Sequence, residues 1–309
     1  MASVPLPTTP APRFVFLRLV TAFWRQEARC LVCPKTPRLD GAVALVTGGN
    51  AGIGLETCRG LLERGARVIM AVRDQDKAAE ACARLRAVEG RDLPLEHRVL
   101  DLSDLDSVAA CARGLEAERI DVFVANAGVW PRAHGLSPQG HEIAFATNVL
   151  GHHLLLRLLE PRLGPGARVV LVTGDIYCLA SACTSDYRYR GSLGGMLAYC
   201  RSKLGTLWEV AVWQARHVEW RVVAVHPGVV ASGLGGRAPG RSGLSCARGA
   251  QTSLFAATQP DVPPGAYLHN TLGLVRLPKR DPALDRAKAA ELWERCEELC
   301  APWLGVGGA

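Results

Sequence analysis

The chain has 309 residues, of which 49% are hydrophobic and 21% are charged. This composition excludes a disordered chain and is sufficient for a full hydrophobic core. The formal net charge is only +7, and the basic residues are scattered along the sequence. A nucleic-acid-binding protein is therefore not indicated, and we expect no nucleic-acid partner.

The first 38 residues differ from the rest of the chain. A proline-rich lead is followed by an apolar run at 14–24, which Arg18 interrupts. The run is too short to cross a bilayer, and no small-residue cleavage site follows it, so it fits a signal peptide poorly. A helix lying on a membrane surface and a helix packed on the domain both stay open. We predict an N-terminal extension at 1–38, one domain at 39–304 and a short tail at 305–309.

The chain contains eleven cysteines, an odd number, and many of them fall in apolar helical stretches. This pattern is typical of small buried thiols in a reducing compartment, so we expect an intracellular protein, either cytoplasmic or membrane-associated. Cys30 and Cys33 form a CxxC without a second cysteine pair or a histidine pair nearby. We therefore predict no metal site.

From residue 42 onward, short apolar runs alternate with helical periodicity. We expect strands at 43–46, 68–72, 95–100, 120–124, 168–172 and 221–225. We expect helices at 53–64, 77–87, 141–158 and 281–304, one that starts near Met196, and one that Ser103 caps. Continuous apolar strands that alternate with helices predict a parallel sheet covered on both faces. The predicted fold class is α/β, a Rossmann-like doubly wound sheet in a single domain.

A glycine-rich turn, TGGNAGIG at 47–54, connects the first strand to the first helix. Glycines permit positive φ and let the backbone approach a pyrophosphate, which the helix N-terminus behind them attracts. Such a turn is often only a turn, but here it has the preceding strand and the following helix that a dinucleotide site requires. The predicted cofactor contacts are Gly48, Asn50, Gly52, Ile53 and Gly54.

The end of the second strand indicates which cofactor is bound. NAD-dependent enzymes place an acidic residue there to bind the ribose 2′-hydroxyl, whereas this chain has Val72 followed by Arg73. A guanidinium binds a 2′-phosphate in bidentate fashion. An exposed arginine at a strand end needs no function, but the pattern favours NADP(H) over NAD(H).

Tyr199 and Lys203 are four residues apart on a predicted helix, so the phenol and the ammonium lie on one face. An adjacent ammonium stabilises the phenolate and lowers the tyrosine pKa, which suits a residue that gives and takes a proton near neutral pH. We therefore predict that Tyr199 and Lys203 are catalytic.

Four more motifs occur in order along the chain: Asp101-Leu102-Ser103, Asn126-Ala127-Gly128, Thr147-Asn148-Val149 and His226-Pro227-Gly228. Together with the glycine turn and the Tyr199/Lys203 pair, they make the chain resemble the short-chain dehydrogenase/reductase family over nearly all of 39–304. The resemblance implies that Asn148 holds a relay water for the lysine. The further cofactor contacts that it implies are Asp101, Leu102, Asn126, Ala127, Gly128, Pro227, Gly228 and Val229.

Within this family, the segments 198–204, 225–230 and 249–254 look like the retinol-dehydrogenase-like branch. Members of that branch typically prefer NADP(H) and act on lipophilic alcohols and carbonyls, and many carry an N-terminal membrane anchor. The resemblance therefore implies an oxidoreductase of a small lipophilic alcohol or carbonyl, such as a retinoid or steroid. A homo-oligomer and a membrane-surface contact through the N-terminus are further expectations.

The chain departs from the family at the serine that binds the substrate oxygen beside the tyrosine. That position falls on Gly174, which has no hydroxyl. The adjacent Thr173 should point to the other side of the strand, so it is only a candidate substitute, as are Ser181 and Ser185 in the loop that follows. Because such a donor is worth orders of magnitude in rate, a cofactor-binding regulatory or scaffolding protein with weak or lost catalysis is the alternative.

A second departure concerns residues 230–249, which are rich in glycine, arginine and proline where the branch carries a bulky apolar lid. A polar lid does not favour a retinoid. The candidates for an apolar pocket are Trp130, Tyr177, Leu179 and Leu197, although core packing is the more usual role of such residues.

Overall fold

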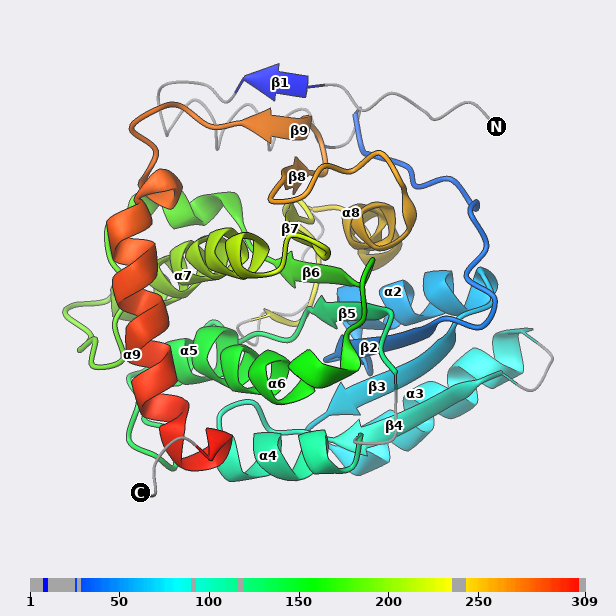
Figure 1. The fold of residues 1–309 in the computed structure, drawn as a ribbon, viewed down its shortest axis with the longest axis horizontal. Helices are drawn as coiled ribbons and strands as arrows, with labels where there is room; N and C mark the ends of the chain where they lie inside the picture. Colours follow the sequence, from blue (N-terminus) through cyan, green and yellow to red (C-terminus); the bar gives the residue numbers. More distant parts are fainter. Residues whose placement is uncertain are drawn as a thin grey trace.

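The computed structural model describes residues 8–10, 26, 29–89, 93–115, 119–234 and 243–305. The apolar run at 14–24, the segment 235–242 of the glycine-rich region and the tail beyond 305 lie outside the described residues. Within the described ranges, nine strands form one sheet in the order β1-β9-β8-β7-β6-β5-β2-β3-β4 (Figure 1).

The sheet is parallel except at one edge, where β8 and β9 pair antiparallel. Its strands are β1 (Thr8–Pro10), β2 (Val43–Thr47), β3 (Arg67–Val72), β4 (Leu95–Val99), β5 (Val122–Ala125), β6 (Arg168–Val172), β7 (Arg221–His226), β8 (Tyr267–His269) and β9 (Gly273–Arg276). β2 pairs with β3 on one side and with β5 on the other. The chain order reverses between β2 and β5, and the carboxyl ends of strands at such a switch point form the ligand crevice of open α/β sheets.

Helices cover both faces of the sheet (Figure 1). One face carries α2 (Gly52–Glu63), α3 (Gln75–Glu89) and α8 (Cys246–Thr258), and the other carries α4 (Leu105–Arg113), α5 (Ile143–Phe145), α6 (Gly151–Leu159), α7 (Gly194–Arg216) and α9 (Arg286–Leu304). Each face of the sheet has its own hydrophobic core, and successive strand residues point into opposite cores. Leu45 packs in the core under α6, α7 and α9, and Val46 packs in the core under α2 and α8. Two buried faces explain why these strands are continuously apolar.

Several element boundaries differ from the sequence-based expectation. The predicted helix at 141–158 consists of α5, a π-helical turn at Ala146–Leu150, and α6. Ser103 is not the N-cap of α4, because Asp104 accepts the capping hydrogen bond from the Asp106 amide. α9 starts at Arg286 rather than at 281, since Pro282–Leu284 forms a 3-10 turn and Asp285 caps the helix. Strands β1, β8 and β9 and helix α8 were not predicted from the sequence.

The described parts of the N-terminal extension pack on the domain. Thr8–Pro10 pairs with β9, and the buried Gln26 accepts a hydrogen bond from the Val229 amide at 2.9 Å. All eleven cysteines are free thiols, and eight of them are buried. Among the described helices, none has both the length and the apolar character that a bilayer-spanning segment requires.

Candidate active site

Most of the predicted site residues gather at one edge of the sheet, because they follow the carboxyl ends of parallel strands. The glycine turn follows β2, Arg73 follows β3, and Asp101 and Leu102 follow β4. Asn126, Ala127 and Gly128 follow β5, Thr173 and Gly174 follow β6, and Pro227, Gly228 and Val229 follow β7. This is the edge at which open α/β sheets bind their ligands.

The glycine turn has the geometry of a phosphate cradle. Gly48 and Gly52 adopt φ of 68° and 59°, which favour glycine. A Cβ on Gly54 would overlap the carbonyl oxygen of Gly48 and the side-chain amide of Asn126, so a larger residue would fill the cradle. No side chain caps α2 at Ala51, so its first amides are available to an anion. These residues therefore fit a dinucleotide pyrophosphate.

Asn126 supports this turn from the neighbouring strand. Its side-chain amide donates to the Thr47 carbonyl at 2.9 Å, and the Thr47 hydroxyl accepts the amides of Asn126 and Ala127, each at 3.0 Å. The same hydroxyl lies 2.9 Å from Nε2 of His152. Asn126 thus shapes the cofactor crevice by joining the ends of β2 and β5.

Arg73 and Asp101, two of the predicted cofactor contacts, follow the neighbouring strands β3 and β4. Arg73 is exposed directly after β3. The Asp101 carboxylate accepts the amide of Ser103 at 2.9 Å and its hydroxyl at 2.6 Å, which holds the turn after β4. The Leu102 carbonyl packs so closely on α6 that a Cβ on Gly151 would overlap it. The turn after β4, which carries the predicted cofactor contacts Asp101 and Leu102, is therefore held in place by α6 and by its own hydrogen bonds.

Tyr199 and Lys203 both lie on the buried side of α7. The Tyr199 ring stacks on Trp130, with ring centroids 4.8 Å apart and planes inclined by 3°. The Lys203 ammonium lies 5.5 Å from the centre of the Tyr199 ring and donates to the Val172 carbonyl at 2.8 Å. The predicted pair is thus brought together beside the end of β6.

Burial governs the protonation of both groups. It raises the pKa of Tyr199 above its ordinary value and lowers the pKa of Lys203 to about 8. The expectation that Lys203 lowers the tyrosine pKa is therefore not met in the protein alone, because desolvation disfavours the phenolate. A phenol with a raised pKa stays protonated at neutral pH and is a proton donor.

Asn148 lies in the π-helical turn, and such turns are frequent at functional sites. Its side chain accepts from the Val129 amide at 2.8 Å and donates to the Val129 carbonyl and the Ser202 hydroxyl, each at 2.9 Å. It therefore ties the loop after β5 to α7, next to Lys203.

Thr173 and Gly174 occupy the place of the expected serine. The Thr173 hydroxyl donates to the Lys203 carbonyl at 2.8 Å, so its proton is already used and Thr173 is not a substitute donor. A Cβ on Gly174 would lie 3.8 Å from Nδ1 of His226 and 3.9 Å from Ile176, which are ordinary contacts. The backbone there has room for a serine that the sequence does not supply.

The candidates for an apolar pocket lie in different surroundings in the structure. Trp130 contacts Tyr199, whereas Tyr177 is fully buried and its hydroxyl donates to Asp281 at 2.9 Å. Leu179 is exposed. Trp130 thus contacts Tyr199 of the predicted pair.

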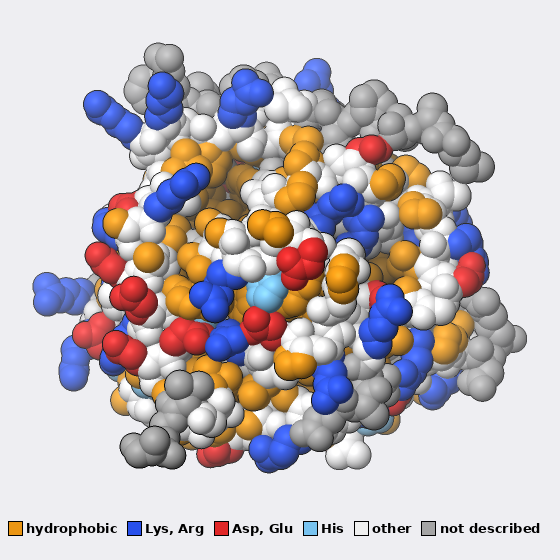
Figure 2. Space-filling model, in the orientation of Figure 1, with side chains coloured by type: hydrophobic (Ala, Val, Ile, Leu, Met, Phe, Trp, Pro, Cys, Tyr) orange, Lys and Arg blue, Asp and Glu red, His pale blue; other side chains and the backbone are white. Residues whose placement is uncertain are grey.

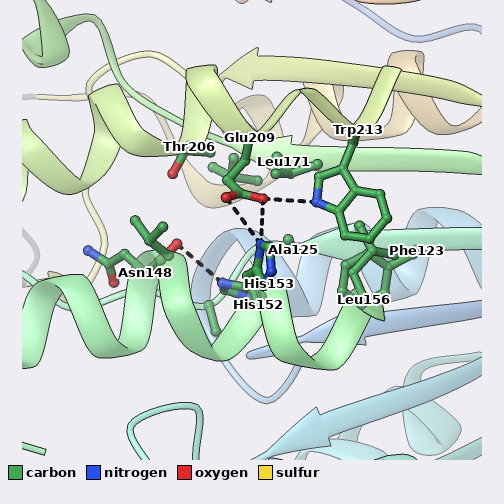
Figure 3. A pocket seen from close by; sticks show the side chains of 13 residues that line it. Phe123, Ala125, Asn148, His152, His153, Leu156, Leu171, Thr206, Glu209 and Trp213 are labelled. Atoms are coloured by element: carbon green, nitrogen blue, oxygen red, sulfur yellow. Dashed lines mark hydrogen bonds and ion pairs between the residues drawn. The ribbon is translucent and has the colours of Figure 1, made fainter. Parts of the chain in front are cut away.

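A small cavity of about 10 Å³ lies behind Asn148, between α6, α7 and the sheet. Figure 3 shows Asn148, His152, His153 and Glu209 around it. Burial, and then the charge of Lys203, lower the pKa of His152 to about 3, so this imidazole is neutral. The cavity has room for about one water molecule and is too small for a substrate.

Sequence reasoning missed a second polar cluster at this edge. Tyr267 donates to Asp175 at 2.6 Å, and Nε2 of His269 lies 3.0 Å from the same carboxylate. The His226 and His269 rings are 4.6 Å apart. The signal available was an acidic residue directly after the Gly174 position, but β8, which carries Tyr267 and His269, had not been recognised.

A glycine cradle at the switch point of a parallel sheet and a buried Tyr/Lys pair beside it define a dinucleotide-dependent oxidoreductase. The comparisons with known proteins agree. A short chain dehydrogenase family model matches residues 42–239. The chain therefore belongs to the short-chain dehydrogenase family, whose members are oxidoreductases that use nicotinamide cofactors.

Individual relatives indicate which branch of the family this chain resembles. Retinol dehydrogenase 14 of Homo sapiens is 34% identical over 328 residues, which cover 92% of this chain and 96% of that protein. Retinol dehydrogenase 12 of Homo sapiens is 34% identical over 312 residues, which cover 94% of this chain and 96% of that protein. Among solved structures, an uncharacterized protein from Mycobacterium Paratuberculosis has a TM-score of 0.72 at 33% identity, over 85% of this chain and 95% of that one. The resemblance to the retinol-dehydrogenase-like branch is thus confirmed.

Proposed function

We propose that this protein is an NADP(H)-dependent dehydrogenase/reductase of a small lipophilic alcohol or carbonyl, of the retinoid or steroid kind. The observation that carries the proposal is the buried Tyr199/Lys203 pair at the carboxyl edge of the sheet, next to the glycine cradle. The nicotinamide, when bound, supplies or accepts the hydride. Tyr199 donates the proton to the carbonyl oxygen in reduction and takes it back in oxidation.

The surroundings of Tyr199 support a lipophilic substrate. The indole of Trp130 covers one face of the phenol. Leu136 and Leu193, which are 58% and 57% exposed, lie on the segments that lead from Trp130 and into α7. Gly195, at the start of α7, packs on the Pro131 carbonyl, so these two segments meet. The names of the relatives, retinol dehydrogenases, point to the same substrate class.

The test of the proposal is turnover by the purified chain over a panel of retinaldehydes, steroid ketones and aliphatic aldehydes. We expect reduction with NADPH, and we expect Tyr199→Phe to lower kcat/KM by at least about 10²-fold, the lower end of the effect of a positioned acid. NADPH affinity should change little, because the phenol serves the reacting oxygen. Equal turnover by the wild type and Tyr199→Phe would refute the proposal.

Cofactor preference depends on Arg73. The exposed guanidinium follows β3 directly, where an acidic residue would repel a 2′-phosphate. We expect tighter binding of NADPH than of NADH, and we expect Arg73→Asp to reverse this preference, measured by fluorescence titration of both cofactors. Arg113→Asp, at the end of α4, is the matched control. An unchanged ratio of the two dissociation constants in Arg73→Asp would contradict the assignment.

Gly174 supports a second function, that of a cofactor-bound regulatory or scaffolding protein with little catalysis. Since a serine side chain has room at this position, the distinction is experimental. A wild type that binds NADPH without turnover, combined with a partner protein that dissociates when NADPH is removed, would support the scaffold over the enzyme.

A further inference from the structure

We propose that Arg84, on α3, binds the 2′-phosphate of NADP(H) together with Arg73. This inference rests on the proposed NADP(H)-dependent function and names a second residue that determines the choice of cofactor. The Arg84 guanidinium donates a hydrogen bond of 3.4 Å to the carbonyl of Asn50, in the glycine turn, although the two residues are 34 positions apart in the chain. Arg84 thus contacts the loop that is predicted to bind the cofactor.

The register of the sheet brings Arg84 and Arg73 to the same place. Thr47 and Ala71 are partners in the parallel pair of β2 and β3. Asn50 follows Thr47, and Arg73 follows Ala71, so both residues leave the sheet at its carboxyl edge. A backbone hydrogen bond of 2.8 Å from the glycine turn to the Ala71 carbonyl keeps the two strand ends together. Arg84, through its contact with Asn50, therefore lies beside the same part of the crevice as Arg73.

The direction of α3 explains how a residue well inside this helix reaches the glycine turn. α3 starts at Gln75, shortly after the end of β3, so its N-terminus lies at the carboxyl edge of the sheet. Helical side chains lean towards the N-terminus of their helix. The long Arg84 side chain therefore extends towards the edge at which open α/β sheets bind their ligands.

The charge of a 2′-phosphate favours two cations over one. A phosphate monoester carries about −1.5 to −2 charges at pH 7, so the single charge of Arg73 leaves part of it unbalanced. Arg84 is exposed, and a guanidinium has more N–H donors than its one bond to the Asn50 carbonyl uses. Two guanidinium groups would balance the phosphate and offer it the planar, paired donors that phosphate oxygens accept.

The acidic residues closest to these arginines in the chain are engaged elsewhere. Asp74 follows Arg73 directly, but its carboxylate accepts the Lys77 amide at 3.1 Å and pairs with the Lys77 ammonium at 2.9 Å. On α2, which follows the glycine turn, Glu56 pairs with Arg59 at 3.0 Å. Asp74 thus caps the start of α3, and its charge is compensated there by Lys77.

The experiment compares the dissociation constants of NADPH and NADH for the wild type and Arg84→Ala by fluorescence titration. We expect Arg84→Ala to weaken NADPH binding by about 10- to 100-fold, the effect of losing a hydrogen bond to a charged group. NADH, which lacks the phosphate, should keep its wild-type affinity. Arg86→Ala is the matched control. Arg86 also lies on α3 and donates to a backbone carbonyl, but to that of Leu95 at the start of β4, at 2.7 Å.

The bond to Asn50 gives Arg84 a competing role as a support of the glycine turn. That role alone would make Arg84→Ala weaken NADPH and NADH equally, and this result would overturn the inference. Adenosine 2′-monophosphate, displacing NADPH, is an independent probe of the phosphate contact. Arg84→Ala should weaken it as much as it weakens NADPH, and unchanged affinity for this fragment would also contradict the inference.

The failure of this inference can be distinguished from the failure of the proposed function. If the wild type prefers NADPH and Arg73→Asp reverses that preference, but Arg84→Ala binds both cofactors like the wild type, the inference is wrong and the proposed function stands. A wild type that binds NADPH no more tightly than NADH would overturn both. Since the Arg84 side chain is exposed, Arg84→Ala should fold normally, and its thermal unfolding midpoint checks this.

Discussion

Lys203 is a buried lysine whose burial costs stability while it is charged, and we propose that the charge serves catalysis. Burial lowers its pKa to about 8. A lysine with a lowered folded-state pKa destabilises the fold while it is charged, and this cost disappears as the pH rises from about 8 through the ordinary lysine pKa. The ammonium contacts the Tyr199 ring and the end of β6, so its charge is available to the site below about pH 8.

We therefore expect Lys203→Met to lower kcat/KM by at least about 10²-fold and yet to raise the unfolding midpoint at pH 7 by about 2 °C or more. In the wild type, kcat/KM should fall as the pH rises through about 8, since the ammonium is then lost. Turnover assays and calorimetry across pH 6.5–9.5 check both outcomes. A lower midpoint in Lys203→Met at pH 7 would show instead that the hydrogen bond to Val172 stabilises the fold.

The residues of the site differ in how far the sequence reveals them. Gly54 and the Tyr199/Lys203 pair were predicted because their spacing is local, within one turn or one helix. Other contacts join residues far apart in the chain: Trp130 stacks on Tyr199, and His226 lies near Gly174. Such contacts cannot be predicted from local periodicity. The pKa of Tyr199 was predicted in the wrong direction because burial cannot be read from a Tyr-x-x-x-Lys spacing.

At the scale of elements, the central strands could be predicted because each is buried on both faces and therefore continuously apolar. β8 and β9 are short strands near one edge of the sheet, joined by a turn at 270–272, and no run of apolar residues marks them. The π-helical turn at Ala146–Leu150 could not be predicted from the sequence for a different reason. One extra residue in a helical turn does not disturb an apolar pattern that is buried almost all round.

Helix α9 is held on α6 and α7 by an ion-pair network around His153. Nδ1 of His153 lies 3.1 Å from Glu209 on α7, and Nε2 lies 2.8 Å from Glu297 on α9. Trp213 donates to Glu209 at 2.9 Å, and Figure 3 shows His153, Glu209 and Trp213 together. Burial alone would lower the pKa of His153, but the two carboxylates outweigh it and raise the pKa to about 9. The stabilisation is complete below the unfolded pKa of about 6.5 and is lost as the pH rises through about 9.

Glu209→Gln should therefore destabilise the protein by about 3–5 kcal/mol at pH 6.5, because it leaves a buried imidazolium with one of its two partners removed. The difference from the wild type should shrink as the pH is raised through 9. Urea unfolding at several pH values measures both. Glu298→Gln, which removes an exposed ion pair on the same region of α9, is the matched control and should stay within about 0.5 kcal/mol. A Glu209→Gln effect independent of pH would contradict the charged state of His153.

At the scale of the whole molecule, the face that α9 crosses carries charges of both signs. Figure 2 shows acidic and basic side chains interspersed with hydrophobic ones on the face that α9 crosses. The N-terminal extension contacts the domain through both a backbone strand pairing and a side-chain hydrogen bond. It adds β1 to the sheet edge beside β9, and it reaches the segment after β7 through Gln26. Of the two roles left open for the extension, the described residues show packing on the domain, with a contact at Val229 just after β7.

This contact makes a testable link between the extension and the cofactor. The Gln26 side chain is 3% exposed, and its oxygen accepts the amide of Val229, a predicted cofactor contact. An unpaired buried amide costs about 1–3 kcal/mol, so Gln26→Ala should loosen the segment after β7 and weaken NADPH binding by about tenfold. Isothermal titration measures the affinity, with Glu294→Ala on the exposed side of α9 as the control. Unchanged NADPH affinity in a folded Gln26→Ala would mean that the extension only rests on the domain, without supporting its chemistry.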